Sequence, residues 1–212
     1  MTARRRPPAA PLVLATASPR RIELVAALGV PFRLLHVNFR ETLPSLPPEE
    51  AARMLAWRKA ETACRGLRRG VVVTADTLVA LNGHLYGKPR SPRDAAAMLA
   101  QLSGRTHEVV TAVAVMDAAT HRGMLGSERS LVTFRRLAAA TIRAYVATGE
   151  PLDKAGAYGI QGRGRALVAR LRGDYLNVVG FPLHLFVALA RRFGVIIPAA
   201  PVRRLYARRR PG

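Results

Sequence analysis

Cysteine is almost absent from this chain of 212 residues, in which Cys64 stands alone. A single cysteine excludes an intramolecular disulfide and any zinc site built from several cysteines, and it suits a reducing compartment. Long apolar runs are absent too. The nearest one, residues 178–190, contains Pro182 and His184 and is too short to span a membrane. We therefore expect a soluble, cytoplasmic protein.

Acidic residues are also scarce. The 34 basic residues outnumber the 13 acidic ones and give a formal net charge of +21. Eight arginines lie in the terminal segments 1–10 and 198–212, which are rich in Pro and Ala and which we predict to be flexible basic tails. The remainder, 11–197, keeps an excess of positive charge and is long enough for one globular domain. This balance favours polyanionic partners, for which nucleotides and nucleic acids both qualify.

Lysine is the rarest charged residue, with Lys59, Lys88 and Lys154 set against 31 arginines. In a chain so biased toward arginine, a lysine indicates a place where a compact ammonium is needed and a planar guanidinium does not serve. Chance is the alternative explanation for three residues. Each of the three falls in a stretch that other features also single out, which favours the functional interpretation.

The stretch 71–90 is the one around which the other motifs are arranged. The β-branched run Val71–Val73 predicts a buried strand that ends at Asp76. The chain then continues extended into Asn82-Gly83, a strong hairpin signal, and the return limb brings Lys88. We expect Asp76 and Lys88 to lie close together, as a base and a cation suited to hydrolysing a phosphate ester. A capped strand end with a solvated lysine is the alternative.

A second candidate site begins at Ser18, where Ser-Pro after the apolar strand 12–15 predicts a helix N-terminus. Arg20 and Arg21 lie in its first turn, where positive charge opposes the helix dipole. This placement is favourable if an anion binds between the arginines and the helix end. A plain N-cap with solvated arginines is the alternative.

Three further candidates lie in other segments. Glu41, in an irregular loop, could bind a divalent cation or be a solvated carboxylate. Lys59 lies near the apolar face of a helix predicted over 48–64, where lysines more often snorkel than catalyse. The glycine-rich stretch 149–164 contains Lys154 and Gln161 but lacks a Walker pattern, so by itself it is weak support for a ligand site.

The remaining periodicities predict strands at 32–37, 107–116, 125–134 and 167–171 and helices at 92–102, 141–148 and 182–193.

Taken together, the motifs resemble the Maf family in unbroken order from Leu12 to Gly194. They are Ser18-Pro19-Arg20-Arg21, Lys59-Ala60, Ala75-Asp76-Thr77, Gly87-Lys88-Pro89, Leu102-Ser103-Gly104-Arg105-Thr106-His107 and the segment Asp153-Lys154-Ala155-Gly156-Ala157-Tyr158-Gly159-Ile160-Gln161-Gly162. The resemblance implies a nucleoside triphosphate pyrophosphatase with a mixed α/β fold. In this fold a twisted sheet is flanked by helices, as in inosine-triphosphate pyrophosphatases, and the active site lies in a cleft between two lobes. It also implies a homodimer and a divalent cation, Mg²⁺ or Mn²⁺.

The resemblance implies roles for the candidate residues. Asp76 would be the proton acceptor for the attacking water, with a cation bound beside it and Glu41 as a second metal ligand and catalytic group. Lys59 and Lys88 would be catalytic. The remaining candidates, Ser18, Arg20, Arg21, Thr77, Lys154 and Gln161, would bind substrate. Arg40 beside Glu41 departs from the family pattern, which has an acidic residue there.

Three positions resemble the family branch that acts on dTTP and UTP, namely Arg20, Thr77 and Gln161. A glutamine both donates and accepts hydrogen bonds, and so matches the imide edge of a pyrimidine. A nucleic-acid-binding or cell-division regulatory protein that uses the arginine-rich tails is the alternative from another class. An inosine-triphosphate pyrophosphatase is the alternative among enzymes, and the Ser18 and Gln161 motifs disfavour it.

Overall fold

The computed structural model describes residues 10–39 and 42–207. In chain order its elements are β1 (Leu12–Ala15), α1 (Pro19–Ala26), β2 (Phe32–Leu35), α2 (Pro48–Cys64), β3 (Val71–Leu81), β4 (His84–Tyr86), α3 (Pro92–Leu102), β5 (Thr106–Asp117), β6 (Gly123–Phe134), α4 (Ala139–Val146), η1 (Glu150–Asp153), η2 (Ala155–Ala157), η3 (Gly162–Leu167), β7 (Val168–Arg172), α5 (Tyr175–Val179), α6 (Leu183–Arg191) and α7 (Ala199–Ala207).

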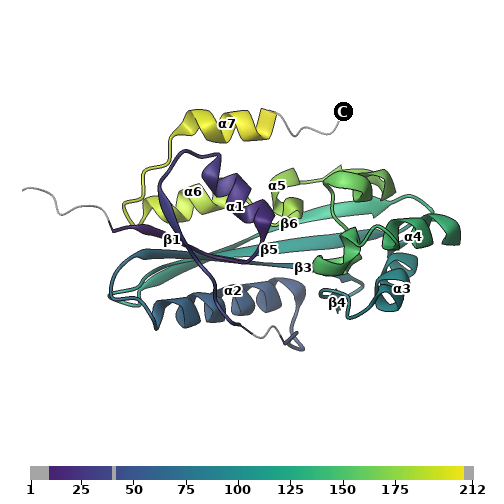
Figure 1. Cartoon of the computed structure of the whole chain (residues 1–212), viewed down its shortest axis with the longest axis horizontal. Coiled ribbons are helices and arrows are strands. Elements are labelled where there is room, and N and C mark those ends of the chain that lie inside the picture. Colours follow the sequence, from purple (N-terminus) through teal and green to yellow (C-terminus); the bar gives the residue numbers. More distant parts are fainter. Residues whose placement is uncertain (1–9, 40–41, 208–212) are drawn as a thin grey trace, which may run out of the picture.

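The strands form one mixed sheet of seven strands in the order β2-β1-β3-β5-β6-β7, and β4 pairs with β3 (Figure 1). The parallel pairs are β1 with β2 and β1 with β3, and all other pairs are antiparallel. Parallel neighbours require crossover connections, which α1 and α2 supply, whereas short turns join β3 to β4 and β5 to β6, and α3 lies between β4 and β5. The predicted mixed α/β fold with helices flanking the sheet is confirmed.

Helices cover both faces of the sheet (Figure 1). On one face α2 packs through a run of fully buried alanines, and the small side chains allow the helix to approach the strands closely. The buried hydroxyl of Thr74 on β3 donates to the carbonyl oxygen of Ala56 on α2 at 2.7 Å. This bond fixes α2 along β3, and it anchors the part of β3 next to Asp76.

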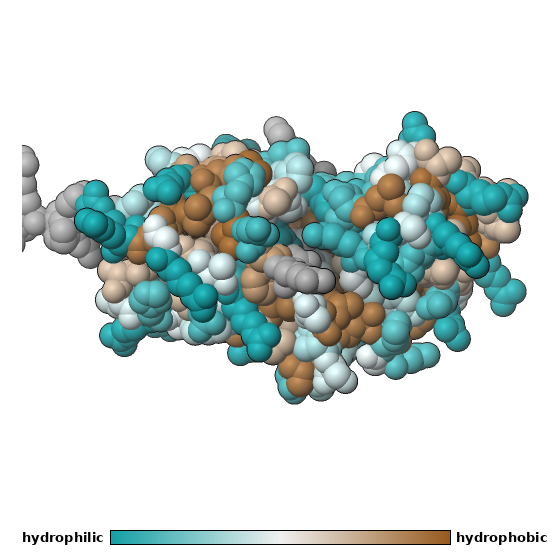
Figure 2. Space-filling model, turned by 60° about the horizontal axis from the view of Figure 1, so that its bottom comes forward, coloured by the Kyte–Doolittle hydropathy of each residue, from teal (hydrophilic) through white to brown (hydrophobic). Residues whose placement is uncertain are grey.

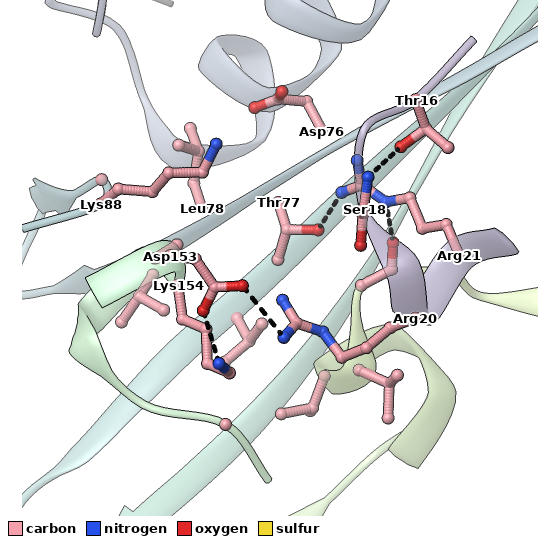
Figure 3. Close-up of a pocket in the computed structure, with 18 of the residues that line it drawn as sticks. Thr16, Ser18, Arg20, Arg21, Asp76, Thr77, Leu78, Lys88, Asp153 and Lys154 are labelled. Carbon is pink, nitrogen blue, oxygen red and sulfur yellow. Dashed lines mark hydrogen bonds and ion pairs between the residues drawn. The ribbon is translucent and has the colours of Figure 1, made fainter. Parts of the chain in front are cut away.

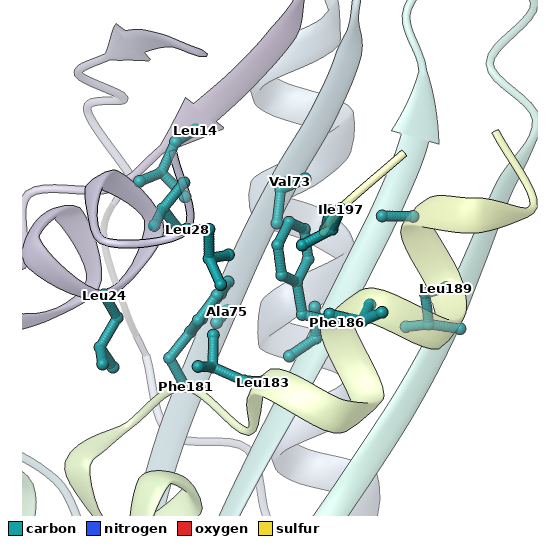
Figure 4. Packing of buried hydrophobic residues seen from close by; sticks show 14 of the residues in the cluster. Leu14, Leu24, Leu28, Val73, Ala75, Phe181, Leu183, Phe186, Leu189 and Ile197 are labelled. Carbon is teal, nitrogen blue, oxygen red and sulfur yellow. The ribbon is translucent and has the colours of Figure 1, made fainter. Parts of the chain in front are cut away.

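The opposite face is covered by α1, α5 and α6, which share the largest apolar cluster of the protein. In this cluster Phe181, Leu183 and Phe186 are fully buried against Val73 and Ala75 of β3 (Figure 4). Side chains on a strand alternate between its two faces, so Val73 and Ala75 face α1 and α6, whereas Thr74 and Asp76 face α2.

Two predicted boundaries are wrong. The strand does not end at Asp76, because β3 continues to Leu81 in register with β5. The predicted flexible tail 198–212 is helical over Ala199–Ala207, where α7 buries Val202 and Leu205 in the same large apolar cluster as Phe181 and Phe186. The predicted tail arginines at 4–6 and 208–210 lie outside the described residues. No helix of the described chain is long and apolar enough to cross a membrane.

A separate apolar cluster, which includes Phe134 and Tyr158, encloses His107, which is 1% exposed. Its Nε2 lies 2.8 Å from the hydroxyl of Tyr158, and Phe134 and Tyr158 pack edge-on against its ring. Its Nδ1 has no hydrogen-bond partner among the described residues. Burial lowers the pKa of His107 to about 4, so the imidazole is neutral in the folded protein at pH 7.

Replacing Leu205 by Ala should lower the free energy of unfolding by about 2 kcal/mol, because the truncation leaves a cavity beneath α7. Urea denaturation measures the change. Arg204→Ala, at an exposed position of the same helix, should change stability by less than about 0.5 kcal/mol. Equal stability of the Leu205→Ala variant and the wild type would contradict the packing of α7.

Stability should also fall in mild acid. An unfolded histidine takes up a proton below about pH 6.5, whereas folded His107 does so only near pH 4. The contribution of His107 to the free energy of unfolding is therefore lost as pH falls from 6.5 toward 4. Between pH 7.5 and pH 5 the wild type should lose about 2 kcal/mol more than His107→Gln does. Exposed His84→Gln is the control, and identical pH profiles for wild type and His107→Gln would refute the effect.

Candidate active site

Strand β3 changes partner along one of its edges. On that edge β1 pairs with Val71–Val73 and β4 pairs with Val79–Leu81, so Thr74–Leu78 has no strand partner there among the described residues. On the other edge β5 pairs with Val71–Ala80 without interruption. A cleft of about 940 Å³ opens at the break. Ligands of α/β proteins commonly bind where the strand connections diverge in this way.

The cleft is lined by residues from the β1–α1 junction, α2, β3, the segment after β4, η1, the glycine-rich loop and the end of α5. The charged side chains among them are Arg20, Arg21, Lys59, Lys88 and Lys154, which are basic, and Asp76, Glu150 and Asp153, which are acidic. The excess of positive charge suits an anionic ligand. On the face shown in Figure 2, apolar residues form separate patches among hydrophilic ones.

Asp76 is the most deeply placed of these carboxylates, with only 4% of the residue exposed. Its Oδ1 lies 3.6 Å from Nζ of Lys59, which is also buried. The Lys59 ammonium lies over the ring of Phe39, 5.8 Å from its centroid. A buried carboxylate is stable when a cation compensates it, so the pair on β3 and α2 holds a charged group at the floor of the cleft.

Lys88 follows β4 and lines the same cleft as Asp76 (Figure 3). The sequence predicted this proximity from the Asn82-Gly83 hairpin. In the structure this turn folds β4 back along β3, toward the part of β3 that has no strand partner on this edge. Both φ angles at the turn are positive, at 52° for Asn82 and 78° for Gly83, as a tight hairpin requires.

The mouth of the cleft carries an ion pair between two separate segments. Arg20, at the start of α1, lies 3.9 Å from the Asp153 carboxylate at the end of η1, and Lys154 donates to the same carboxylate (Figure 3). Burial raises the pKa of Asp153, but Lys154 and Arg20 outweigh that effect and hold the pKa below its usual range. Asp153 was not among the predicted site residues, although its neighbour Lys154 was.

Ser18 occupies the predicted N-cap position of α1, with extended backbone angles, but its side chain makes no capping hydrogen bond. Its backbone N–H donates to Oγ1 of Thr16 at 3.1 Å, and both residues line the cleft (Figure 3). The hydroxyl that the sequence assigned to capping therefore lies at the cleft wall beside the first N–H groups of α1.

Arg21 joins three segments through its guanidinium. Nε donates to the Gly180 carbonyl at 2.8 Å, one terminal nitrogen donates to the Ala75 carbonyl at 2.8 Å, and the other donates to Thr77 Oγ1 at 3.0 Å. Ala75 belongs to the stretch of β3 that has no strand partner on this edge, so Arg21 supplies its carbonyl with a donor. The structure shows Arg21 holding the cleft together, and its predicted contact with substrate stays a prediction.

Thr77 is part of a directed chain of hydrogen bonds. The hydroxyl of Thr111 donates to the carbonyl of Asn177 at 2.9 Å and lies 2.9 Å from the Thr77 hydroxyl. Since a hydroxyl has one proton, Thr77 must donate to Thr111 while it accepts from Arg21. The Thr77 hydroxyl thus has no proton left for a ligand, and its orientation is fixed by the protein.

Asn177 completes this chain and was missed from the sequence. The side chain is fully buried, accepts from the N–H of Thr111 at 3.1 Å, and donates to Val109 and Ser130. It sits in α5, a helix of five residues that the sequence did not predict. No local pattern marks an asparagine whose partners lie 47 to 68 residues away along the chain.

Gln161 lines the cleft from the glycine-rich loop, and within the described part of the chain its carboxamide makes no hydrogen bond. Glu41, the other predicted metal ligand and catalytic group, lies outside the described residues. No cluster of three or more His, Cys, Asp or Glu side chains suited to holding a metal occurs in residues 10–39 and 42–207. Within residues 10–39 and 42–207, Asp76 is thus the buried carboxylate in the cleft that is available to a cation.

Comparisons with known proteins agree on one family. The pattern of the family described as Maf-like protein matches residues 11–193. A protein of Moorella thermoacetica named dTTP/UTP pyrophosphatase is 54% identical over 87% of this chain and 95% of its own length. Proteins with the same name from Pelotomaculum thermopropionicum and Deinococcus radiodurans are 46% and 45% identical, covering 86% and 87% of this chain and 96% and 93% of their own.

Arg21→Lys should lower the free energy of unfolding by about 2 kcal/mol or more, because one ammonium cannot serve three acceptors that a planar fork reaches together. The matched control is Arg20→Lys, whose guanidinium makes a single ion pair at the cleft mouth and whose replacement should cost well under about 1 kcal/mol. Chemical denaturation compares the two variants. Equal losses would mean that the three bonds of Arg21 do not stabilise the fold.

Proposed function

The chain belongs to the family of Maf-like proteins, and from this membership and the chemistry of the cleft we propose that it hydrolyses dTTP and UTP to the monophosphate and pyrophosphate. The observation that carries the proposal is the buried Asp76, held by Lys59 at the floor of a cleft with an excess of basic side chains. A nucleoside triphosphate brings several negative charges, which such a cleft can offset.

In the proposed reaction a water molecule attacks the α-phosphorus of the bound triphosphate. The new bond joins the water oxygen to this phosphorus, the bond to the bridging oxygen of the β-phosphate breaks, and pyrophosphate leaves with the bonding electron pair. The proton of the water passes to the Asp76 carboxylate. Asp76 suits this role because β3 is paired with β5 along this stretch and bonded to α2 at Thr74, which fixes the carboxylate relative to the cleft.

The basic side chains would hold the triphosphate and offset the charge that develops during attack. Lys59 is paired with Asp76 at the floor and Lys88 lines the same cleft, whereas Arg20 and Lys154 share the Asp153 carboxylate at the mouth. Substrate would draw Arg20 away from its ion pair with Asp153, since a phosphate carries more charge than one carboxylate. Arg21 would act indirectly, by fixing Thr77 and the start of α1.

A divalent cation, Mg²⁺ or Mn²⁺, fits this cleft only as a partner shared with substrate. Asp76 supplies a hard oxygen ligand, and the triphosphate oxygens and water would supply the others, as is usual for Mg²⁺ on nucleotides. When bound, such an ion neutralises phosphate charge and lowers the pKa of a coordinated water. Glu41 remains the proposed second carboxylate, on the family resemblance alone.

Selectivity for dTTP and UTP would depend on Gln161, supported by Arg20 and Thr77. The edge of uracil or thymine presents an N–H donor between two carbonyl acceptors. A carboxamide offers both an acceptor and donors, so Gln161 can pair with this edge, and it has the freedom to do so because the described residues leave it without a hydrogen bond. Thr77, whose proton is already donated, would act through shape and as an acceptor.

We also propose a homodimer that acts in the cytoplasm, which the family resemblance and the single cysteine support. Size-exclusion chromatography with light scattering tests the assembly. DNA binding through the terminal arginines is the alternative function. It predicts salt-sensitive binding that disappears when residues 1–9 and 208–212 are removed, while nucleotide hydrolysis would be unaffected by their removal.

Pyrophosphate release should be detected with dTTP and UTP in the presence of Mg²⁺ or Mn²⁺, and Asp76→Asn should reduce it roughly a hundredfold or more, because the amide cannot accept the proton. The control is Asp117→Asn, on β5, where the side chain accepts hydrogen bonds within a turn that an amide oxygen can also accept. Turnover of Asp76→Asn at the wild-type rate would remove Asp76 from its role. Folded wild-type protein without turnover on any nucleoside triphosphate would overturn the proposed activity.

A further inference from the structure

The Glu150 carboxylate, at the start of η1, receives three hydrogen bonds from one neighbouring loop and helix. Oε1 accepts from the hydroxyl of Tyr145 at 2.9 Å and from the backbone N–H of Gly164 at 3.2 Å. Oε2 accepts from the backbone N–H of Arg163 at 3.1 Å. Glu150 therefore differs from Asp76, whose carboxylate faces the Lys59 ammonium, because its oxygens accept from neutral donors of α4 and the glycine-rich loop.

Tyr145, on α4, holds the same loop at Gly159. Its hydroxyl accepts from the backbone N–H of Gly159 at 3.1 Å while it donates to Glu150. Burial raises the pKa of Tyr145 well above its usual range, and the Glu150 carboxylate adds to the rise, whereas the Gly159 N–H acts in the opposite direction. The phenol thus stays protonated and can serve as donor and acceptor at once.

The two ends of this loop are in close contact at Gly164. A Cβ added there would collide with the carbonyl oxygen of Gly159 and would lie 2.6 Å from the Tyr145 hydroxyl. Only glycine allows the loop to close on itself at this point. The closed loop runs from Gly159 to Gly164, is tied at both ends to Tyr145 and Glu150, and carries Gln161 between its ends.

We propose that Glu150 and Tyr145 are a positioning pair that fixes Gln161 against the base of the substrate and so sets the preference for pyrimidine over purine triphosphates. This inference rests on the proposed function. Neither residue is assigned contact with the reacting atoms. Their effect on the base is transmitted through the backbone of residues 159–164, which they hold by three N–H groups.

Loosening the loop should affect recognition of the base more than the chemical step. Asp76 and Lys59 are held by β3 and α2, through contacts that do not involve the loop. Lys154 donates to the backbone carbonyl of Glu150 at 2.6 Å, a group that side-chain substitutions leave in place. We therefore expect changes in KM and in substrate preference, with kcat for dTTP close to the wild-type value.

The test compares Tyr145→Phe with Tyr206→Phe. Tyr206 is a matched control because its hydroxyl also donates to a carboxylate, that of Asp174 at 2.8 Å, but lies on α7, whose residues do not line the cleft. The ratio of kcat/KM for dTTP to that for GTP should fall about tenfold in Tyr145→Phe, mainly through KM, since small displacements of a positioning group are costly. The ratio should be unchanged in Tyr206→Phe, and an unchanged ratio in Tyr145→Phe would overturn the proposal.

A graded pair of Glu150 variants gives a second test. Glu150→Ala removes every acceptor and should reduce the preference at least as much as Tyr145→Phe does. Glu150→Gln keeps one acceptor oxygen for Tyr145 and Gly164 and should restore most of the preference. The Gln161→Ala variant shows how far the preference for dTTP over GTP falls when the carboxamide itself is removed. A wild-type preference for dTTP in Glu150→Ala would contradict the proposal, provided that the variant shows a cooperative thermal transition. If Glu150→Ala does not fold, the substrate preferences of Tyr145→Phe and Glu150→Gln test the proposal in its place.

Binding measurements separate this inference from the proposed activity. Calorimetry with non-hydrolysable dTTP and GTP analogues reports base preference without turnover. A wild type that prefers the dTTP analogue but releases no pyrophosphate would overturn the activity alone, and the Tyr145→Phe variant would still test the pair by its affinity ratio. A wild type that hydrolyses dTTP selectively, with the preference lost in Gln161→Ala but kept in both Tyr145→Phe and Glu150→Ala, would overturn the pair alone.

Discussion

The unpaired edge of β3 is the constraint on which the rest of the site depends. A sheet edge buried inside a protein leaves backbone groups without donors or acceptors, and such groups must find other partners. Here the Arg21 guanidinium donates to the Ala75 carbonyl on that edge, which ties α1 to the sheet just beyond the point where the pairing with β1 ends. At Ala75 a side chain, in place of a strand, therefore supplies the donor for β3, and the cleft opens beside it.

The same arrangement separates two kinds of function on adjacent residues. Asp76 and Thr77 are consecutive, so their side chains face opposite sides of the sheet. Asp76 faces α2 and Lys59, a rigid and buried environment suited to proton transfer. Thr77 faces α1 and α5, where Arg21, Thr111 and Asn177 fix its hydroxyl. One strand thereby places a buried carboxylate and a hydroxyl of fixed orientation in one cleft.

The carboxylates that line the cleft differ in their partners. Of its three carboxylates, Asp153 is held at the mouth by Arg20 and Lys154, and Glu150 is engaged by the loop. Asp76, beside Lys59, is the one placed at the floor. The basic side chains that line the cleft come from four separate segments, so an anionic ligand would contact several parts of the chain at once.

The sequence by itself determined the local elements and the family. The helices Pro48–Cys64 and Pro92–Leu102 begin at a proline, the second with a Ser91 cap, and the Asn82-Gly83 hairpin follows from its turn residues, and these signals act over a few positions. Only the tertiary structure decided that β3 passes through Asp76, that the C-terminal segment forms α7, and that Thr77 is committed to Arg21 and Thr111. Each of these depends on partners dozens of residues away, and a contact between distant residues leaves no periodic trace in the chain. The burial of Val202 and Leu205, for example, is set by a surface that other helices build.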